Sequence, residues 1–533
     1  MATFDVKAIQ IGGTPLNLDD WIDYRYLSFE DCQTAVIKDQ PVFKNGRVTP
    51  KFYDCRYLIP ADSPVVRNLE WLRHLPANGI VLADSVAIPA AQQRLTEQLN
   101  VQRVSFADRQ QLAQTLKLNF FTGQYGFQFQ TEHLQVAPSY LGVVKKRGIE
   151  KTIFAGPFTD QMQWLGSFNF PYFAKAATQW EILAEVGVTG NVDLELRMTL
   201  LATNSQYEDQ QMCFSLKQLL SGAIVLPPFM KTGYNVTFSL YGCGKGTVEV
   251  GTIFFRQSHN GRGAMMIGGQ AVIDPNDMNR SWLMYFDAGD LRPPLNVYFS
   301  GNRADDGFEG NFMMRRLGAP YILVSDQRFT GGGFYVGNQK FAHALVQYIQ
   351  DKLALLGFTS DQLIMSGVSM GTYGSEYYAA DLKPHAIIAG KQLAGLGRIA
   401  TNNRIKRPDD FDNGLDILSG VTGGLTDEDV DKGDHILVDH MATGDLSHTK
   451  FAITYMKNDD YDDEGFKTIS QFLWKNYPGL NFRHKGLIGR HIDQPGAMFQ
   501  WFLDQYKDIM VHDFGRTEMA ADELNYIPGE END

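Results

Sequence analysis

The hydrophobic pattern changes twice along this chain of 533 residues, and its third section constrains the fold most. From residue 281 onward, short apolar runs alternate with helical patterns. The apolar runs cover residues 281–286, 295–299, 321–325, 362–365, 386–389, 451–455 and 480–488. Between them, residues 340–356 place apolar side chains on one helical face, and Gly357 follows as a stop signal. This alternation predicts a mostly parallel sheet covered by helices on both faces.

The first two sections have different patterns. Residues 1–122 mix expected strands at 6–11 and 80–83 with expected helices at 90–99 and 107–116, which indicates a small α/β segment. Residues 123–260 mostly alternate with period two, as in NVDLELRMTL and TVEVGTIFFR. Such alternation, rich in β-branched and aromatic residues, predicts antiparallel strands in a β-sandwich-like module. Modules of this kind often bind carbohydrate or protein, although the fold does not fix the function.

The polar, glycine-rich segment QSHNGRG ends the second section, so we expect an α/β domain over residues 261–515 and an acidic tail over 516–533. An Asp-rich insertion at 405–435 interrupts the domain. This insertion is either a solvent-exposed acidic segment or a cap over the site. A calcium site is disfavoured, because the acids at 427–431 lack the glycine and the terminal glutamate of an EF-hand loop.

Composition excludes several classes of protein. The formal net charge of −13, from 61 acidic and 48 basic residues, argues against nucleic-acid binding. Four cysteines without a CxxC pair are too few for a disulfide scaffold and do not suggest a thiolate zinc site. The N-terminus lacks the features of a secretory signal, and the longest apolar run, at 219–230, is too short to cross a bilayer. We therefore expect a cytoplasmic protein.

The string GVSMG at residues 367–371 matches G-x-S-x-G. An apolar strand precedes it and a helix-compatible run follows, as in a nucleophile elbow. Small residues on both sides of Ser369 permit the sharp strand-to-helix turn that exposes its hydroxyl. A glycine–serine turn without chemistry is the plainer alternative. The context favours Ser369 as a nucleophile.

A serine hydroxyl needs a base, and in this arrangement the order along the chain is serine, acid, histidine. His491 follows the last expected strand and precedes a helix with Pro495 in its first turn, which is where the base belongs. His484 falls within that strand and His512 lies beyond the helix, so both are weaker candidates. We therefore expect His491 to be the general base.

The acid is expected after the penultimate strand, in the run KNDDYDDE. An acid there would hold the imidazole tautomer and stabilise the imidazolium. Asp460 is the first choice because it lies a few residues before the next helix, and Asp459 is the close second. Asp462, Asp463 and Glu464 fit better as acidic residues at the helix N-terminus.

An oxyanion hole needs two backbone N–H donors. Met370, directly after the serine, should provide one. The loop SGNR at 300–303 should provide the other, through the amide of Asn302 or Arg303. The neighbouring charges, which are Arg303, Asp305, Asp306 and Glu309, either shape an acceptor pocket or form an ordinary charged loop.

Three strings carry a family resemblance: NVYFSGNRADDGFEG, LIMSGVSMGTYGSEYYAADLKPHAIIAGK and IGRHIDQPGAMFQWF. With them the sequence resembles the acetyltransferase-like subunit of the accessory Sec system of Gram-positive bacteria, and the resemblance covers most of the chain. It implies an α/β-hydrolase domain with a Ser/acid/His triad. Ser369 and His491 match the family pattern, whereas the acid maps only to the Asp459/Asp460 pair.

The resemblance also implies O-acetylation of N-acetylglucosamine on serine-rich-repeat adhesins during their export. The implied partners are sister accessory Sec proteins, the accessory SecA motor and the glycosylated adhesin, with peripheral association at the inner face of the membrane. No glycine-rich nucleotide motif is present, so no tightly bound cofactor is expected, and the sequence identifies no acetyl donor. The alternatives are a non-enzymatic export adaptor or chaperone, and a carboxylesterase that uses the same triad.

Overall fold

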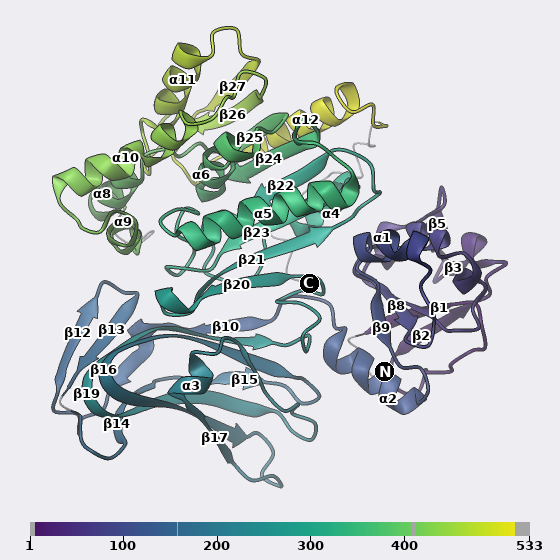
Figure 1. Ribbon diagram of the computed structural model, residues 1–533, viewed down its shortest axis with the longest axis horizontal. Helices are drawn as coiled ribbons and strands as arrows, with labels where there is room; N and C mark the ends of the chain where they lie inside the picture. The colour runs from purple at the N-terminus through teal and green to yellow at the C-terminus, as the bar shows by residue number, and fades with distance from the viewer. Residues whose placement is uncertain (1–5, 157, 408–411, 518–533) are drawn as a thin grey trace.

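The computed structural model describes residues 6–156, 158–407 and 412–517, which build three large sheets (Figure 1). The five-stranded sheet lies to one side of the molecule. The ten-stranded and eight-stranded sheets are stacked beside it, and the latter carries the long helices. The chain is therefore a mixed α/β protein, as the pattern predicts. No helix in these described ranges is both long and apolar enough to cross a membrane.

The N-terminal unit contains a wholly parallel sheet in the order β2-β1-β7-β8-β9. Its strands are β1 (Lys7–Ile11), β2 (Asp23–Leu27), β7 (Arg56–Ile59), β8 (Ile80–Ala83) and β9 (Gln102–Val104). Two small hairpins, β3 (Val36–Ile37) with β4 (Gln40–Pro41) and β5 (Phe43–Lys44) with β6 (Arg47–Val48), interrupt it. Its helices are α1 (Ala90–Gln98) and α2 (Arg109–Asn119), and the Asp108 side chain caps α2 by accepting from the Gln111 N–H. The unit is α/β, as expected.

The second section differs from a sandwich of separate sheets, because ten strands form one continuous hydrogen-bonded sheet. Two long strands, β16 (Trp180–Ala202) and β19 (Tyr234–Gln257), pair antiparallel over almost their whole length, with one bulge near Val186. The others are β10 (Gly126–Phe129), β11 (Leu134–Val136), β12 (Val143–Arg147), β13 (Lys151–Ala155), β14 (Gln163–Phe168), β15 (Tyr172–Ala174), β17 (Gln210–Ser215) and β18 (Ile224–Val225), with helix α3 (Leu216–Leu219). Alternate side chains of this sheet form a separate core.

The third section forms an eight-stranded sheet in the order β20-β21-β23-β22-β24-β25-β26-β27. The strands are β20 (Gln270–Asp274), β21 (Arg280–Asp287), β22 (Leu295–Phe299), β23 (Tyr321–Asp326), β24 (Leu363–Val368), β25 (Ala386–Gly390), β26 (Lys450–Met456) and β27 (Phe482–Leu487). Strands β22 to β27 are mutually parallel, and β21 alone runs in the opposite direction, so that its pairs with β20 and β23 are antiparallel. The prediction of a mostly parallel sheet is confirmed.

Helices cover both faces of this sheet. Helices α5 (Gln339–Leu356), α6 (Met370–Tyr377) and α11 (Gly465–Asn476) pack on one face, and α4 (Asn311–Leu317) and α12 (Pro495–His512) on the other. The remaining helices are α7 (Ala379–Leu382), α8 (Leu396–Lys406), α9 (Gly414–Thr422) and α10 (Asp427–Met441). Neighbouring residues of β24 alternate between the two cores, with Met365 in one and Ile364 in the other.

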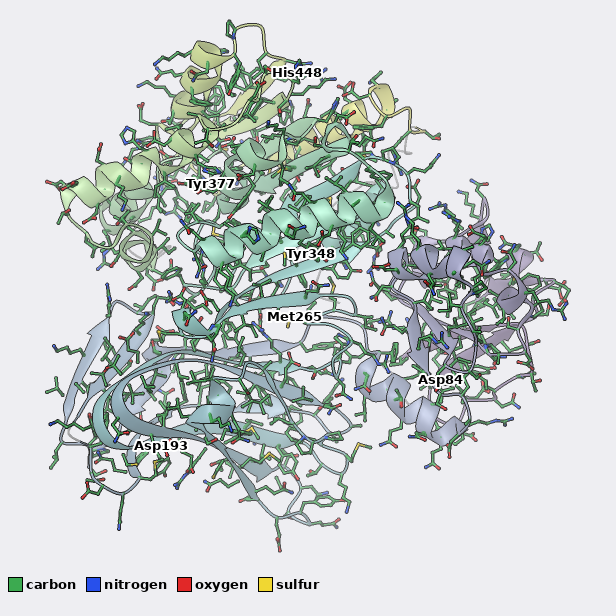
Figure 2. The ribbon with its side chains drawn as sticks, in the orientation of Figure 1. Asp84, Asp193, Met265, Tyr348, Tyr377 and His448 are labelled. Carbon is green, nitrogen blue, oxygen red and sulfur yellow. The ribbon has the colours of Figure 1, made fainter. Side chains whose placement is uncertain are left out.

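Specific contacts join the three sections. Arg94 of α1 donates to the backbone carbonyls of Leu355 and Ala354 at the end of α5. Arg256 of β19 makes a buried, bidentate ion pair with Asp306, at 2.5 and 3.0 Å. Figure 2 places the buried Met265 between the ten-stranded and eight-stranded sheets. The Arg256–Asp306 pair thus attaches the loop after β22 to the β-rich section, and Arg94 attaches the N-terminal unit to α5.

Candidate active site

The turn between β24 and α6 holds Ser369 in a strained conformation. Its φ of 55° and ψ of −121° lie outside the regions that serine normally adopts. A Cβ on Gly367 would lie 2.2 Å from the Gly371 backbone, and one on Gly371 would lie 2.1 Å from the Phe299 carbonyl oxygen. Both glycines are therefore required by close packing, as the elbow motif predicts.

Ser369, His491 and Asp459 form a continuous hydrogen-bond chain. The Ser369 Oγ lies 2.8 Å from His491 Nε2, and His491 Nδ1 lies 2.8 Å from Asp459 Oδ2. An ionised carboxylate only accepts, so Nδ1 carries the proton and Nε2 accepts from the serine hydroxyl. His491 and Asp459 are buried, at 4% and 6% exposure, whereas Ser369 is partly exposed. This arrangement suits a nucleophile, a general base and an orienting acid.

The first choice for the acid, Asp460, is wrong in geometry. Its Oδ1 accepts from the backbone N–H of His491 at 2.9 Å, and its Oδ2 pairs with Arg407 at 2.6 Å. Burial raises the pKa of Asp460, but the hydrogen bonds from His491 and Arg407 outweigh it and leave the pKa below its usual value. Asp460 therefore holds the loop of His491, while Asp459 contacts the imidazole.

Two further contacts fix the imidazole and its acid. The Tyr461 ring stacks on His491 with centroids 4.4 Å apart and an interplanar angle of 14°. The second Asp459 oxygen accepts from the backbone N–H groups of Tyr461 and Asp462, at 2.9 and 3.1 Å. Tyr461 was not among the predicted site residues, although an aromatic residue directly after the acid pair is a signal for such a stacking partner.

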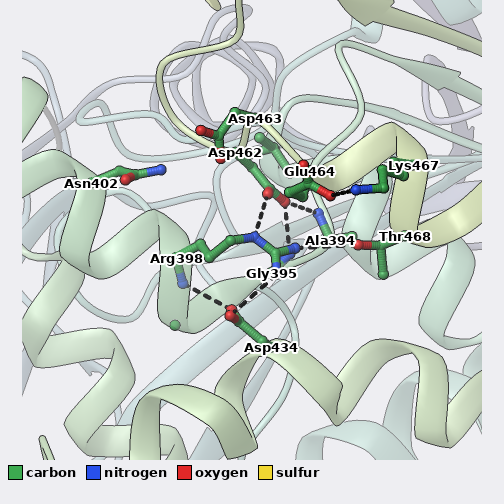
Figure 3. Close-up of polar contacts among 12 residues, drawn as sticks. Ala394, Gly395, Arg398, Asn402, Asp434, Asp462, Asp463, Glu464, Lys467 and Thr468 are labelled. Atoms are coloured by element: carbon green, nitrogen blue, oxygen red, sulfur yellow. Dashed lines mark hydrogen bonds and ion pairs between the residues drawn. The ribbon is translucent and has the colours of Figure 1, made fainter. Parts of the chain in front are cut away.

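An ion-pair network behind the acid loop connects it to the Asp-rich insertion (Figure 3). Arg398 pairs with Asp462 at 3.0 Å and with Asp434 of α10 at 3.2 Å. The Asp462 carboxylate also accepts from the N–H groups of Ala394 and Gly395, both at 2.7 Å. The interpretation of Asp462 as a helix-terminal charge was therefore incomplete, because its carboxylate anchors the loop that carries Asp459.

The insertion itself is largely helical. Helix α10 begins with a capping box between Thr426 and Asp429, and acidic residues occupy its first turn. These contacts explain the carboxylates at 427–429 without a ligand. Residues 408–411, which hold two of the insertion's aspartates, lie outside the described residues.

Of the three backbone amides predicted for the oxyanion hole, the structure leaves two without a hydrogen-bond partner among the described residues and occupies the third. The Met370 N–H lies at the first position of α6, where helix geometry provides no partner. The Asn302 N–H likewise has no hydrogen-bond partner among the described residues. By contrast, the Arg303 N–H donates to the Gly331 carbonyl at 3.1 Å, so the choice of the Arg303 amide is wrong. Met370 and Asn302 are the pair with free donors.

The other charged residues of the loop after β22 make different contacts. Glu309 accepts from the Gly301 N–H at 2.7 Å, which leaves Asn302 as the next amide along the loop. Asp306 is occupied by the buried pair with Arg256, so it belongs to the link between sections. Arg303 donates to the Phe308 carbonyl at 2.9 Å and, together with Asp305, lines a cavity described below.

The two weaker histidine candidates lie elsewhere. His484 belongs to β27, with its ring 5.1 Å from that of Phe466. His512 ends α12, where its Nδ1 lies 3.0 Å from the Asp508 carbonyl oxygen. The choice of His491 over both agrees with the observed geometry.

A buried carboxyl group lies on the nucleophile helix. Glu376 of α6 is fully buried, and burial raises its pKa to about 8, although a hydrogen bond from Gln392 lowers it in part. The unfolded chain ionises this group near pH 4.5, so between pH 4.5 and 8 only the folded state keeps the proton. Stability from this group is therefore largest at low pH and falls as pH rises, by at most about 1.4 kcal/mol per pH unit.

We expect Glu376→Gln to remove this dependence. Between about pH 5 and 8, the urea midpoint of the wild type should fall more than that of the variant. The exposed Glu208, changed to Gln, is the matched control and should follow the wild type. Parallel slopes for the wild type and Glu376→Gln would show that Glu376 is ionised throughout.

These contacts define a mixed α/β protein with a Ser–His–Asp chain at a strand-to-helix turn. A family model described as accessory Sec system GspB-transporter matches residues 7–516, and the chain belongs to this family. An accessory Sec system protein of Staphylococcus aureus is 30% identical over 525 residues, covering 96% of this chain and 98% of that relative. One from Streptococcus gordonii is 34% identical over 417 residues, covering 78% and 81%.

A solved structure is similar over nearly the whole chain. It is described as a Glycosylation Associate Protein complex from Streptococcus agalactiae. The match has a TM-score of 0.83 and 29% identity, and covers 97% of this chain and 100% of that chain. The fold of all three sections is therefore shared with a relative.

Proposed function

We propose that this protein is an O-acetyltransferase of the α/β-hydrolase type. It would acetylate N-acetylglucosamine on serine-rich-repeat adhesins, coupled to their export by the accessory Sec system. The observation that carries the proposal is the chain from Ser369 through His491 to Asp459, with 2.8 Å at each step. A strained, partly exposed serine beside a buried base is the arrangement that acyl transfer requires.

In the first half of the reaction, the Ser369 Oγ attacks the acetyl carbonyl while His491 Nε2 takes its proton. The N–H groups of Met370 and Asn302 stabilise the negative charge on the carbonyl oxygen. The bond to the leaving group then breaks, and His491 returns the proton to that group. An acetyl ester remains on Ser369.

In the second half, His491 removes a proton from a sugar hydroxyl, and the resulting oxygen attacks the acetyl ester. The bond to Ser369 breaks and the serine recovers its proton from His491. Water in place of the sugar would give an esterase with the same residues, so the acceptor distinguishes the two activities.

The proposed setting follows from the family. Sister accessory Sec proteins, the accessory SecA motor and the glycosylated adhesin are the proposed partners, on the cytoplasmic side and peripherally at the membrane. The relative from Streptococcus agalactiae is described as part of a complex, which supports sister-protein partners for this chain.

A transfer assay tests the proposal. The full chain is incubated with an acetyl donor and a glycopeptide that carries N-acetylglucosamine, and the products are separated by mass. We expect acetyl groups on the sugar, with less free acetate than in the absence of glycopeptide. If the acetyl group appears only as free acetate with every glycopeptide tried, the protein is a carboxylesterase.

A further inference from the structure

A large cavity lies between the N-terminal unit and the eight-stranded sheet. Its volume is about 960 Å³, at the upper end of the range for small-molecule sites. One wall follows α4, because the loop before this helix and the residues after it, at 318–321, both line the cavity. Seven helical residues span about 10 Å, so the cavity is at least that long.

Asn302 connects the lining of the cavity to the candidate active site. Asn302, whose N–H is a free oxyanion donor, lines the cavity as well. A Cβ on Gly331 would lie 2.7 Å from the Asn302 side chain, and one on Gly332 would lie 2.3 Å from Met370. The turn at 331–332 thus packs against both Asn302 and Met370, so a lining residue of the cavity and the residue after Ser369 share one neighbour.

The cavity contains arginines that lack an acidic partner. Arg56 is 8% exposed and donates only to the carbonyls of Phe120 and Phe121, at 2.8 and 2.9 Å. The Arg56 Nη1 makes no hydrogen bond to a described residue, and it is not completely enclosed by protein. Arg47 and Arg303 also donate only to backbone carbonyls within the described ranges. Arg56 alone of the three is buried, and its acidic neighbour Asp54 is already paired with Arg315, so an anionic ligand would offset the cost of burying the Arg56 charge.

Four of the five cavity carboxylates are held by other groups, Asp287 among them by the Tyr285 hydroxyl and the Gly289 N–H, and Asp305 makes no ion pair with a described residue. Asp54 pairs with Arg315 at 2.7 Å, and Asp290 with Arg292 at 2.9 Å. Glu309 is held by the Gly301 N–H. In total six arginines and five acidic residues line the cavity, in a chain whose net charge is −13. The cavity is therefore locally suited to negative charge.

We propose that this cavity binds the acetyl donor, and that the donor is a thioester of a phosphate-bearing carrier. Its phosphates would lie on Arg56 and the other arginines without acidic partners, and its acyl end would reach Ser369 past Asn302. Guanidinium groups bind phosphate by paired, charge-assisted hydrogen bonds. This inference rests on the proposed acyl transfer and adds the donor class to it.

The first half-reaction then has a defined leaving group. The Ser369 Oγ bonds to the thioester carbonyl carbon, and the carbon–sulfur bond breaks. The hydroxyl proton passes through His491 to the departing sulfur. A free thiol and an acetyl ester on Ser369 are the products, and no further reactant is needed.

Acetyl-coenzyme A and 4-nitrophenyl acetate together test the proposal, since only the former carries phosphates. We expect Arg56→Gln to raise the KM for acetyl-coenzyme A about 10- to 100-fold and to leave turnover of the small ester unchanged. Arg47→Gln, at an exposed position, should raise the same KM without affecting folding. Arg73→Gln is the matched control, because Arg73 lines the same cavity but pairs with Glu70 at 2.6 Å.

Each other outcome has a separate meaning. If Ser369 is acetylated by the small ester but coenzyme A does not bind in calorimetry, the donor proposal is overturned and acyl transfer stands. If neither donor acetylates Ser369, the proposed function itself fails. If Arg56→Gln and Arg47→Gln raise the KM for the glycopeptide instead, the cavity belongs to the acceptor and the donor proposal is wrong.

Discussion

Replacing Ser369 with alanine is expected to lower acetyl transfer about 10⁵- to 10⁶-fold. The hydroxyl oxygen proposed as the nucleophile is lost, while the oxyanion donors and the binding surface remain. Alanine keeps the Cβ, so the strain at φ 55° is the same and the fold should be unaffected. The measurement is the rate of acetyl transfer, with circular dichroism as the check on folding.

Ser375→Ala is the control for this variant. Ser375 lies on the same helix and its hydroxyl donates to the Thr372 carbonyl at 2.9 Å, so its loss should leave acetyl transfer nearly unchanged. Full acetylation by Ser369→Ala would contradict the proposed triad and mean that another residue carries the acetyl group. Export that continues while acetylation stops would show that the protein has two separable roles.

The second large effect is expected at Asp459. Asp459→Asn should lower kcat/KM about 10³- to 10⁴-fold, because an amide no longer holds the proton on His491 Nδ1. The proton then favours Nε2, where it prevents the imidazole from accepting the serine proton. The same substitution at Asp460 keeps an acceptor for the His491 N–H, so a loss of only about tenfold is expected.

Kinetics of both variants with a single ester decide between the two aspartates. Stability is compared by thermal unfolding, since Asp460 also pairs with Arg407. A larger loss at Asp460 than at Asp459 would mean that the imidazole exchanges its acid partner during the reaction, against the observed geometry.

Local pattern was sufficient to predict two of the three residues of the Ser369–His491–Asp459 hydrogen-bond chain. Ser369 lies between glycines that only a tight strand-to-helix turn needs, and His491 lies in the loop between the last strand and the last helix. Both signals come from neighbouring residues. The acid could not be chosen in this way, because Asp459 and Asp460 share the same loop and the same residue type.

The choice between them depends on a contact distant in sequence. Arg407 donates a hydrogen bond to the Asp460 carboxylate, whereas the Asp459 carboxylate bonds to the His491 imidazole. In the same way, the Arg303 N–H donates to the carbonyl of Gly331, which belongs to another loop. Such contacts depend on tertiary packing and have no local signature in the sequence.

The fold, like the site, has features that local sequence predicts and features that it does not. Parallel strands of the eight-stranded sheet were predictable, because buried strands appear as continuous apolar runs. For the β-rich section, the sequence predicted antiparallel strands but not which segments join into one long strand. The string TVEVGTIFFR at 247–256 resembles a strand of its own, because Gly242, Gly244 and Gly246 before it are typical of a turn, yet β19 continues through them from Tyr234.

The most direct test of the account is mass spectrometry of the protein quenched during reaction with an activated acetyl ester. One added acetyl group is expected, located on Ser369 by peptide mapping and lost when a glycopeptide with N-acetylglucosamine is added. The acetyl group should then appear on the sugar. An acetyl group on another residue, or no adduct while transfer proceeds at its full rate, would contradict transfer through Ser369.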